Sequence, residues 1–239
     1  MIRSVVVFVI VTCISLSAFA QEKEKKAARP DLPGSFLIDF GFNNGISSPD
    51  NWDEAFWGSR TVNLYYQYPF RFGRSKFSFV PGLGLGLERF KMDNNFTLSS
   101  SPGPDGNYLL IPAEAPTLLT GVKKSMIIAN YFDIPVEFRF DTHPEDLARS
   151  FNFAVGARAG ILFDGLTKVK YKEDGENKIL KDKQNHGLNE FRYGFYTRIG
   201  ISGFNIFMFY NTSPLFEKDK GPSMTTMNTM TIGISLNGF

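Results

Sequence analysis

The stretch that decides the fold is Phe77-Ser-Phe-Val-Pro-Gly-Leu-Gly-Leu-Gly-Leu-Glu88. Large apolar side chains alternate here with small or polar ones: Phe77, Phe79, Leu83, Leu85 and Leu87 against Ser78, Gly82, Gly84, Gly86 and Glu88. A period of two is that of a β-strand, because successive side chains of a strand point to opposite faces. We therefore predict a strand with one continuously apolar face and one small or polar face.

The same alternation returns along the chain, and no long segment keeps the period of an amphipathic helix. The predicted strands are residues 35–42, 60–68, 77–87, 129–140, 151–163, 191–201, 204–211 and 224–236. An even number of strands lets an antiparallel meander close on itself. Closure removes open strand edges, whose backbone N–H and C=O groups would have no hydrogen-bond partners in lipid. The predicted fold is all-β: an eight-stranded antiparallel up-and-down transmembrane β-barrel over residues 35–239.

The apolar faces are expected to meet lipid. The 25 Phe and 9 Tyr residues supply large aromatics to them, while the polar faces carry mainly glycine and isolated charges. A tyrosine and phenylalanine group at Tyr65, Tyr66, Tyr68, Phe70 and Phe72 suits an aromatic belt at a membrane surface. The alternative is a soluble β-sandwich or lipocalin-like barrel with its apolar face inward.

The first residues have the features of an export signal. Arg3 supplies a positive start, residues 5–16 an apolar core, and Ala18-Phe19-Ala20 a small-x-small cleavage site. We predict a signal peptide at residues 1–20 and a flexible periplasmic segment at residues 21–34. Cys13, the one cysteine, lies within this leader, so we expect no disulfide in the mature chain.

Long and short connections alternate between the predicted strands. Long polar segments occupy residues 43–59, 91–122, 165–188 and 212–223, and shorter turns fall near Gly73 and at residues 141–150 and 202–203. Outer-membrane barrels have long extracellular loops and short periplasmic turns. The pattern predicts the outer membrane as the location of the protein.

The polar faces place a set of charges inside the barrel: Asp39, Glu88, Glu137, Arg139, Arg158, Arg192 and Arg198. The lumen of an eight-stranded barrel is only wide enough for side chains, so we expect these charges to pair across it and close it. This expectation disfavours a conducting pore.

The residues show no pattern of a catalytic, cofactor or metal site. The formal net charge of +2 gives no field for nucleic acid. His143 and His186 fall in connections at opposite ends of the predicted barrel, and neither has the partner pattern of a zinc site. Gly82-Leu-Gly-Leu-Gly86 lies inside a strand pattern with no helix after it, unlike a nucleotide-binding loop. Some barrels modify lipids with one histidine, a serine and an acid, and His186 keeps that alternative open.

Three segments resemble a known group, the Bacteroidota outer-membrane β-barrel proteins of the PorT-like family. They are Ser17-Ala-Phe-Ala-Gln21, Phe56-Trp-Gly-Ser-Arg60 with Val62-Asn-Leu-Tyr-Tyr66, and Ser75-Lys-Phe-Ser-Phe-Val-Pro-Gly-Leu-Gly-Leu-Gly-Leu-Glu-Arg-Phe90. The resemblance implies an eight-stranded barrel in the outer membrane, in a family most of whose members have no assigned activity. Its name-giving branch resembles accessory components of the type IX secretion machinery.

We therefore expect a non-enzymatic outer-membrane barrel that acts through its extracellular loops. Its partners would be outer-membrane lipid and, through the loops, another envelope protein, a ligand or a surface polysaccharide, or it would support an export or assembly complex as an accessory component. Residues 91–122 are the candidate contact surface, and a disordered extracellular loop is the alternative for them. Two alternatives remain: an outer-leaflet lipid-modifying enzyme centred on His186, and a narrow solute channel.

Overall fold

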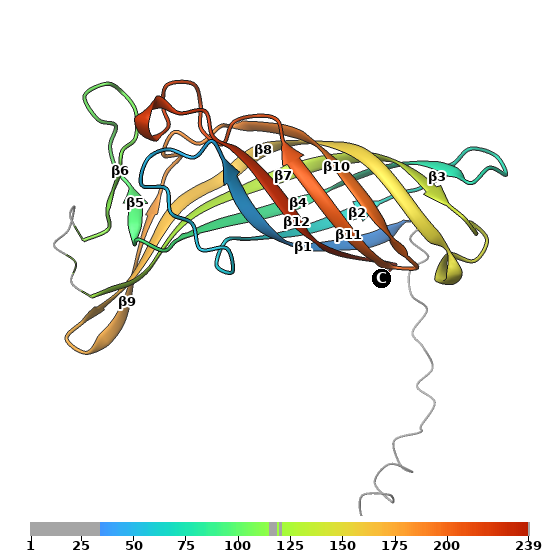
Figure 1. Cartoon of the computed structure of the whole chain (residues 1–239), viewed down its shortest axis with the longest axis horizontal. Helices are drawn as coiled ribbons and strands as arrows, with labels where there is room; N and C mark the ends of the chain where they lie inside the picture. Colours follow the sequence, from blue (N-terminus) through green and yellow to red (C-terminus); the bar gives the residue numbers. More distant parts are fainter. Residues whose placement is uncertain (1–33, 115–118, 120, 239) are drawn as a thin grey trace, which may run out of the picture. The chain divides into compact units, whose positions relative to one another are not determined.

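The computed structural model of the chain describes residues 34–114, 119 and 121–238, so the predicted signal peptide and residues 21–33 lie outside the described residues. Eight strands form a closed ring (Figure 1): β1 (Ser35–Ile46), β2 (Arg60–Gln67), β4 (Phe77–Met92), β7 (Val122–Asp141), β8 (Phe151–Glu173), β10 (Phe191–Ile201), β11 (Phe204–Asn211) and β12 (Asn228–Asn237). Each strand is antiparallel to both neighbours, and the β1–β12 and β8–β10 pairs complete the ring. The predicted eight-stranded antiparallel barrel is confirmed.

The long connections contain regular structure that the sequence patterns did not predict. Two short strands, β5 (Phe96–Leu98) and β6 (Leu110–Pro112), pair with each other, and β9 (Glu176–Lys183) forms a hairpin with the end of β8. The other short elements are β3 (Phe70–Arg71) and the 3-10 turns Leu147–Arg149 and Pro222–Met224. No helix in the described part of the chain is long and apolar enough to cross a membrane.

Four strands are longer than predicted, and all extend at the end that carries β5, β6 and β9: β1 continues to Ile46, and the other three extend further. β4 continues to Met92, β7 begins at Val122 and β8 continues to Glu173. The prediction of residues 91–122 and 165–188 as plain loops was therefore wrong. Side chains in these added segments still alternate between the two faces of the sheet. Lysine takes many of the outward positions, so the segments lack the apolar outer face that identified the other strands.

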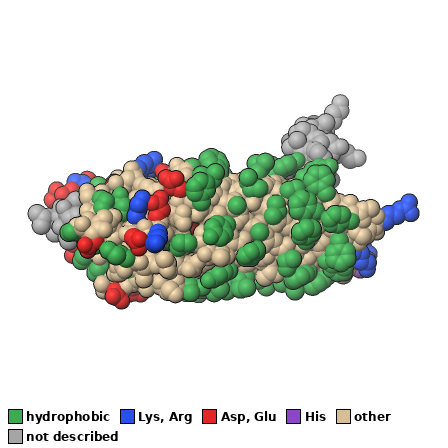
Figure 2. Space-filling view, turned by 90° about the horizontal axis from the view of Figure 1, so that it is seen from above, with side chains coloured by type: hydrophobic (Ala, Val, Ile, Leu, Met, Phe, Trp, Pro, Cys, Tyr) green, Lys and Arg blue, Asp and Glu red, His purple; other side chains and the backbone are tan. Residues whose placement is uncertain are grey.

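Apolar side chains cover the outside of the barrel. Leu83, Ile134 and Phe195 are 65%, 63% and 66% exposed, and hydrophobic side chains spread over the wall in Figure 2. Charged side chains gather toward the end that carries β5, β6 and β9. A soluble barrel would bury these residues, so the outward direction of the apolar faces was predicted correctly.

A β-bulge divides β8 into two registers. Asn130 of β7 pairs with Asp164, whereas Tyr131 pairs with Leu162, so Phe163 has no opposite residue. Before the bulge the odd-numbered residues of β8 face outward, and after it the even-numbered ones do. The bulge marks where the apolar wall of β8 gives way to its polar extension.

Candidate functional site

The candidate site is the interior of the barrel, where the structure places all seven charged residues named from the sequence. They fall into two groups stacked along the lumen. The group nearer the long connections, the Arg192 cluster, consists of Tyr65, Glu88, Asp133, Arg158 and Arg192; the other, the Arg198 cluster, consists of Asp39, Glu137, Arg139, Tyr196, Arg198 and Ser235.

Asp133 of β7 is the centre of the Arg192 cluster. Arg192 donates from Nε to Oδ1 at 3.1 Å and from Nη2 to Oδ2 at 2.5 Å, and its Nη1 also donates to Glu88. The Tyr65 hydroxyl donates to Asp133 Oδ2 at 2.7 Å and accepts a hydrogen bond from Arg158 Nη1 at 2.6 Å. These contacts join β2, β4, β7, β8 and β10 across the lumen.

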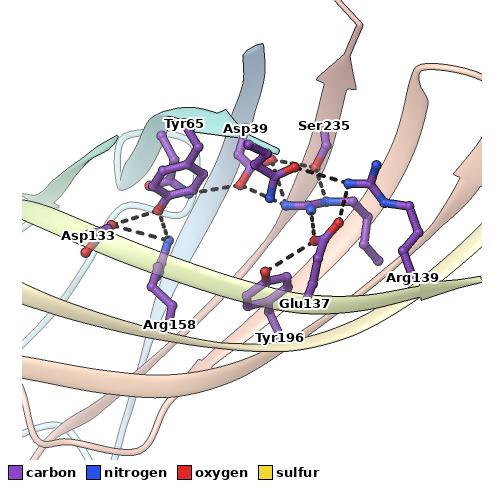
Figure 3. Close-up of polar contacts among 11 residues, drawn as sticks. Asp39, Tyr65, Asp133, Glu137, Arg139, Arg158, Tyr196 and Ser235 are labelled. Carbon is purple, nitrogen blue, oxygen red and sulfur yellow. Dashed lines mark hydrogen bonds and ion pairs between the residues drawn. The ribbon is translucent and has the colours of Figure 1, made fainter. Parts of the chain in front are cut away.

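Arg198 of β10 is the centre of the other cluster, drawn in Figure 3. Its Nη2 lies 3.2 Å from both carboxylate oxygens of Asp39, and its Nη1 lies 2.7 Å from Glu137 Oε2. Ser235 of β12 accepts from Arg198 Nε at 3.0 Å and donates to Asp39 at 2.6 Å. Arg139 pairs with the second oxygen of Glu137. Charge-assisted bonds of this kind are among the stronger ones in proteins.

The charges balance within each cluster. Arg158 and Arg192 meet Glu88 and Asp133, and Arg139 and Arg198 meet Asp39 and Glu137. The seven residues named from the sequence included three acids and four arginines, so Asp133 is the acid that sequence reasoning missed. Its position on the polar face of the pattern at residues 129–140 was the available signal.

Tyr65 does not lie in the aromatic belt that the sequence predicted for it. It faces the lumen and is 2% exposed, because it shares the parity of Asn63 and Gln67 on β2. Clustering with Tyr66 and Tyr68 suggested the belt, but the period of the strand decides the face. Two more buried tyrosines missed from the sequence, Tyr131 and Tyr196, lie under guanidinium groups.

The two clusters leave almost no open space between them. The cavity lined by Asp39, Tyr65, Arg158, Tyr196, Arg198, Phe207 and Phe209 has a volume of about 10 Å³. That is room for about one water molecule. The Arg158 guanidinium lies 3.6 Å from the centre of the Phe209 ring and fills the lumen further. Between the two clusters, the described interior is a packed polar core.

Glycine makes room for this core. A Cβ atom at Gly86 would overlap Nη2 of Arg192 and the carboxylate of Asp133, and one at Gly160 would overlap the same carboxylate. Within the Gly82-Leu-Gly-Leu-Gly86 run, close approach of lumen side chains explains Gly86, whereas a Cβ atom at Gly82 or Gly84 would first meet the backbone of β2.

The long-connection end is closed by an apolar core, which we call the cap core. Its buried residues are Trp52, Phe90, Met92, Leu98, Ile127, Ala129, Tyr131, Leu188, Leu215, Phe216 and Met227. Every one of the four long connections contributes at least one of them: Trp52, Leu98, Leu188 and Leu215 are examples. The cap core lies directly beyond the Arg192 cluster, because Tyr131 of the core carries the Arg192 guanidinium over its ring at 4.0 Å.

Hydrogen bonds between connections hold the cap together. Tyr108 donates its backbone N–H to Lys220 at 2.9 Å, Glu217 donates to Gly187 at 2.8 Å, and Asn189 donates to Leu215 at 2.9 Å. The carboxylate of Glu54 accepts from the Trp52 indole N–H at 3.3 Å and from the backbone N–H of Gly45. Burial raises the pKa of Glu54 above its ordinary value, and these two hydrogen bonds oppose that shift.

The histidines lie at opposite ends of the barrel. His186 is fully buried in the cap, where its ring nitrogens lie 3.2 Å from the Ser99 carbonyl oxygen and 3.3 Å from that of Asp182. His143 is exposed in the turn between β7 and β8, with Nδ1 3.2 Å from the Thr142 hydroxyl. Among the described residues, no group of three or more His, Cys, Asp and Glu side chains is placed to hold a metal ion.

A closed ring of eight strands with an apolar exterior and a polar, paired interior is the architecture of an outer-membrane barrel. The family described as outer membrane protein beta-barrel domain matches residues 19–213 of the chain. The chain belongs to this outer-membrane β-barrel family. The protein is therefore located in the outer membrane, as the sequence predicted. No curated protein matches the chain.

The barrel is also similar to solved structures. Ail, the attachment invasion locus protein of Yersinia pestis, is 13% identical, with 87% of this chain and 100% of that chain covered and a TM-score of 0.34. A mutant porin of Rh. blastica is 9% identical, with 86% of this chain and 98% of that chain covered and a TM-score of 0.17.

Proposed function

We propose that this outer-membrane barrel is a non-enzymatic binding protein whose cap engages another envelope protein as an accessory component of an export or assembly complex. Membership of the narrower Bacteroidota PorT-like group is part of the same proposal.

The observation that carries the proposal is the order of the cap. Four connections far apart in sequence share one apolar core and exchange backbone hydrogen bonds. A surface that is already ordered loses less conformational entropy on binding, so such order favours recognition. The segment between β5 and β6 is the most prominent contact candidate, since residues 100–102 and 104–106 are all exposed.

The interior supports a binding role over transport. Both lumen clusters are neutral and packed, and the space between them holds about one water molecule. A solute channel needs a continuous polar path, so this barrel would have to unpack buried ion pairs to conduct.

The surroundings of His186 support a binding role over lipid modification. Its two ring nitrogens face backbone carbonyl oxygens, and its side chain has no exposed surface. A general base must reach the hydroxyl that it activates and the substrate that it serves.

The test is cross-linking in native outer membranes followed by affinity capture of the tagged barrel. Replacing residues 100–106 by a Gly/Ser segment of equal length alters the exposed surface while keeping Leu98 and Leu110. The same replacement of residues 145–149, in the turn between β7 and β8, is the matched control. We expect a defined envelope protein to disappear from the capture with the first variant and to remain with the control. An identical set of captured proteins from both variants would contradict the proposal.

A further inference from the structure

A group of basic side chains lies on the outside of the barrel, just beyond the apolar wall toward the cap. We call it the basic lattice: Arg60, Arg89, Lys91, Lys124, Lys168, Lys170, Lys181 and Lys183. Neither the lumen site nor the cap core uses these residues.

Strand pairing fixes the neighbours in the lattice. Its first row, from β2 to β9, is Arg60, Arg89, Ile128, Leu166 and Lys183. The second row, from β4 to β9, is Lys91, Met126, Lys168 and Lys181. The third row, from β7 to β9, is Lys124, Lys170 and Ile179. Adjacent strands are about 4.8 Å apart, so the rows form a compact basic surface, in which Met126 and Leu166 are buried and Ile128 is half-buried.

The lattice holds positive charge that the protein itself does not balance. Arg60 faces Arg89, Lys168 faces Lys181, and Lys124 faces Lys170 as direct cross-strand pairs. Like charges in such positions destabilise a sheet. Lys91 pairs with Asp93 at 2.9 Å, and in the described ranges the other seven lattice residues have no ion pair.

Lys124 shows how concentrated this charge is. Burial and then the positive charges of Arg60, Lys91, Lys168 and Arg89 lower its pKa. A sheet that tolerates this repulsion gains stability when an anion neutralises it.

The aromatic residues beside the lattice indicate its depth in the membrane. Arg60 is directly opposite Phe42 on β1, and the Phe42 ring centre lies 5.2 Å from that of Phe56 and 5.3 Å from that of Trp57. Trp57 is 76% exposed. Exposed tryptophan and phenylalanine beside a lipid-facing wall mark the level of the lipid headgroups. The long-connection end of such barrels faces outward, so this level belongs to the outer leaflet.

We propose that the basic lattice binds the phosphate groups of an anionic lipid in the outer leaflet. Arginine and lysine supply the charge and donors that phosphate oxygens take, while the half-buried Ile128 contacts the upper acyl chains. This site is separate from the cap surface of the proposed function, and each can fail without the other.

The test compares the full mature barrel in nanodiscs of phosphatidylcholine with and without diphosphoryl lipid A, and with the same lipid after removal of its phosphates. The lattice variant is Arg89→Gln, Lys124→Gln and Lys168→Gln. The control variant, Arg74→Gln, Lys76→Gln and Arg149→Gln, removes equal charge from exposed positions at the other end. Lipid retained by each protein is measured by native mass spectrometry, and thermal unfolding is measured in parallel.

We expect the wild type and the control to retain diphosphoryl lipid A at least about tenfold more strongly than the lattice variant does, since each basic residue near an anionic surface contributes about 1 kcal/mol. The diphosphoryl lipid should raise the unfolding temperature of the wild type but not of the lattice variant. Rising salt should weaken binding by the wild type.

Three results would overturn the proposal. They are equal retention of the lipid with and without phosphates, an equal loss in the control variant, and retention that salt does not change. Inorganic phosphate alone should compete poorly because it lacks acyl chains; complete displacement by it would show that the ligand is a free anion.

Discussion

Arg192 of β10 and Asp133 of β7 form a two-point ion pair across the lumen, with donor–acceptor distances of 3.1 and 2.5 Å. The strands that carry them are not neighbours in the ring, since β8 lies between them. The pair therefore braces the barrel wall across its interior.

Replacing Arg192 by Met should strongly destabilise the barrel, because it leaves Glu88 and Asp133 as buried carboxylates without their arginine. The expected loss is about 3 to 5 kcal/mol in the free energy of unfolding, measured by urea titration in lipid vesicles. Neutralising both acids in the same chain, with Glu88→Gln and Asp133→Asn, should recover part of it. The exposed control Arg74→Gln should change stability by less than about 0.5 kcal/mol. An Arg192→Met barrel as stable as that control would contradict the role of the pair.

Cysteine labelling should distinguish the lipid face from the lumen. Cys13 is the native cysteine, so Leu83→Cys, Ser235→Cys and Ser101→Cys are each made with Cys13→Ser. In the folded barrel a polar maleimide should react at position 101 and a lipid-soluble one at position 83. Position 235, which is fully buried, should react with neither until the protein unfolds. Fast polar labelling at position 235 would mean that water enters the lumen.

The pH response of the cap should report Glu54. Because burial raises the pKa of this carboxyl, the folded cap binds its proton more readily than the unfolded chain does. Its contribution to stability is therefore fully present below the ordinary carboxyl pKa and is lost as pH rises through the raised one. Trp57→Phe leaves Trp52, which donates to Glu54, as the single tryptophan. Its fluorescence should change with a midpoint above the ordinary carboxyl pKa.

The control for that titration is Glu54→Gln in the same background, which should remove the fluorescence step. A step that persists in this variant would assign the titration to another group.

Replacing His186 by Ala should affect the stability of the cap and leave membrane lipids unchanged. The ring is fully buried beside Tyr108, with ring centres 5.8 Å apart, so truncation leaves a cavity that costs about 1 to 3 kcal/mol. Lipid A and phospholipid profiles by mass spectrometry should match those of the wild type. An altered profile would instead support the lipid-modifying alternative.

The alternation of apolar side chains was sufficient to predict the barrel. The bounds of β10 and β11 match the predicted residues 191–201 and 204–211, because both strands stay within the apolar wall for their whole length. The extensions of β7 and β8 were missed because their outward lysines remove the apolar face on which the prediction depended. Hydrogen bonding to a neighbouring strand, which the pattern of one strand does not contain, keeps these ends in the sheet.

The sequence predicted most of the residues of the candidate site, but it did not predict which of them form ion pairs. Strand parity put Asp39, Glu137 and Arg198 on inner faces, but it holds no information on which strands lie opposite across the ring. Tyr65 shows the converse error, since its aromatic neighbours suggested lipid and its parity indicated the lumen. The cap core was missed because Trp52 and Leu215 come from connections without a period.

The unpaired Phe163 has one more consequence. Because it shifts β8 by a single residue, the odd-numbered side chains face outward in one half of that strand and the even-numbered ones in the other half. If β8 instead continued in regular alternation through Phe163, without the bulge, Lys168 and Lys170 would face the axis and Thr167 and Val169 the surroundings, while the half that crosses the bilayer would be unchanged. The polar extension of β8 beyond the bulge can thus differ in length and polarity while the membrane-embedded half of the strand keeps its apolar outer face.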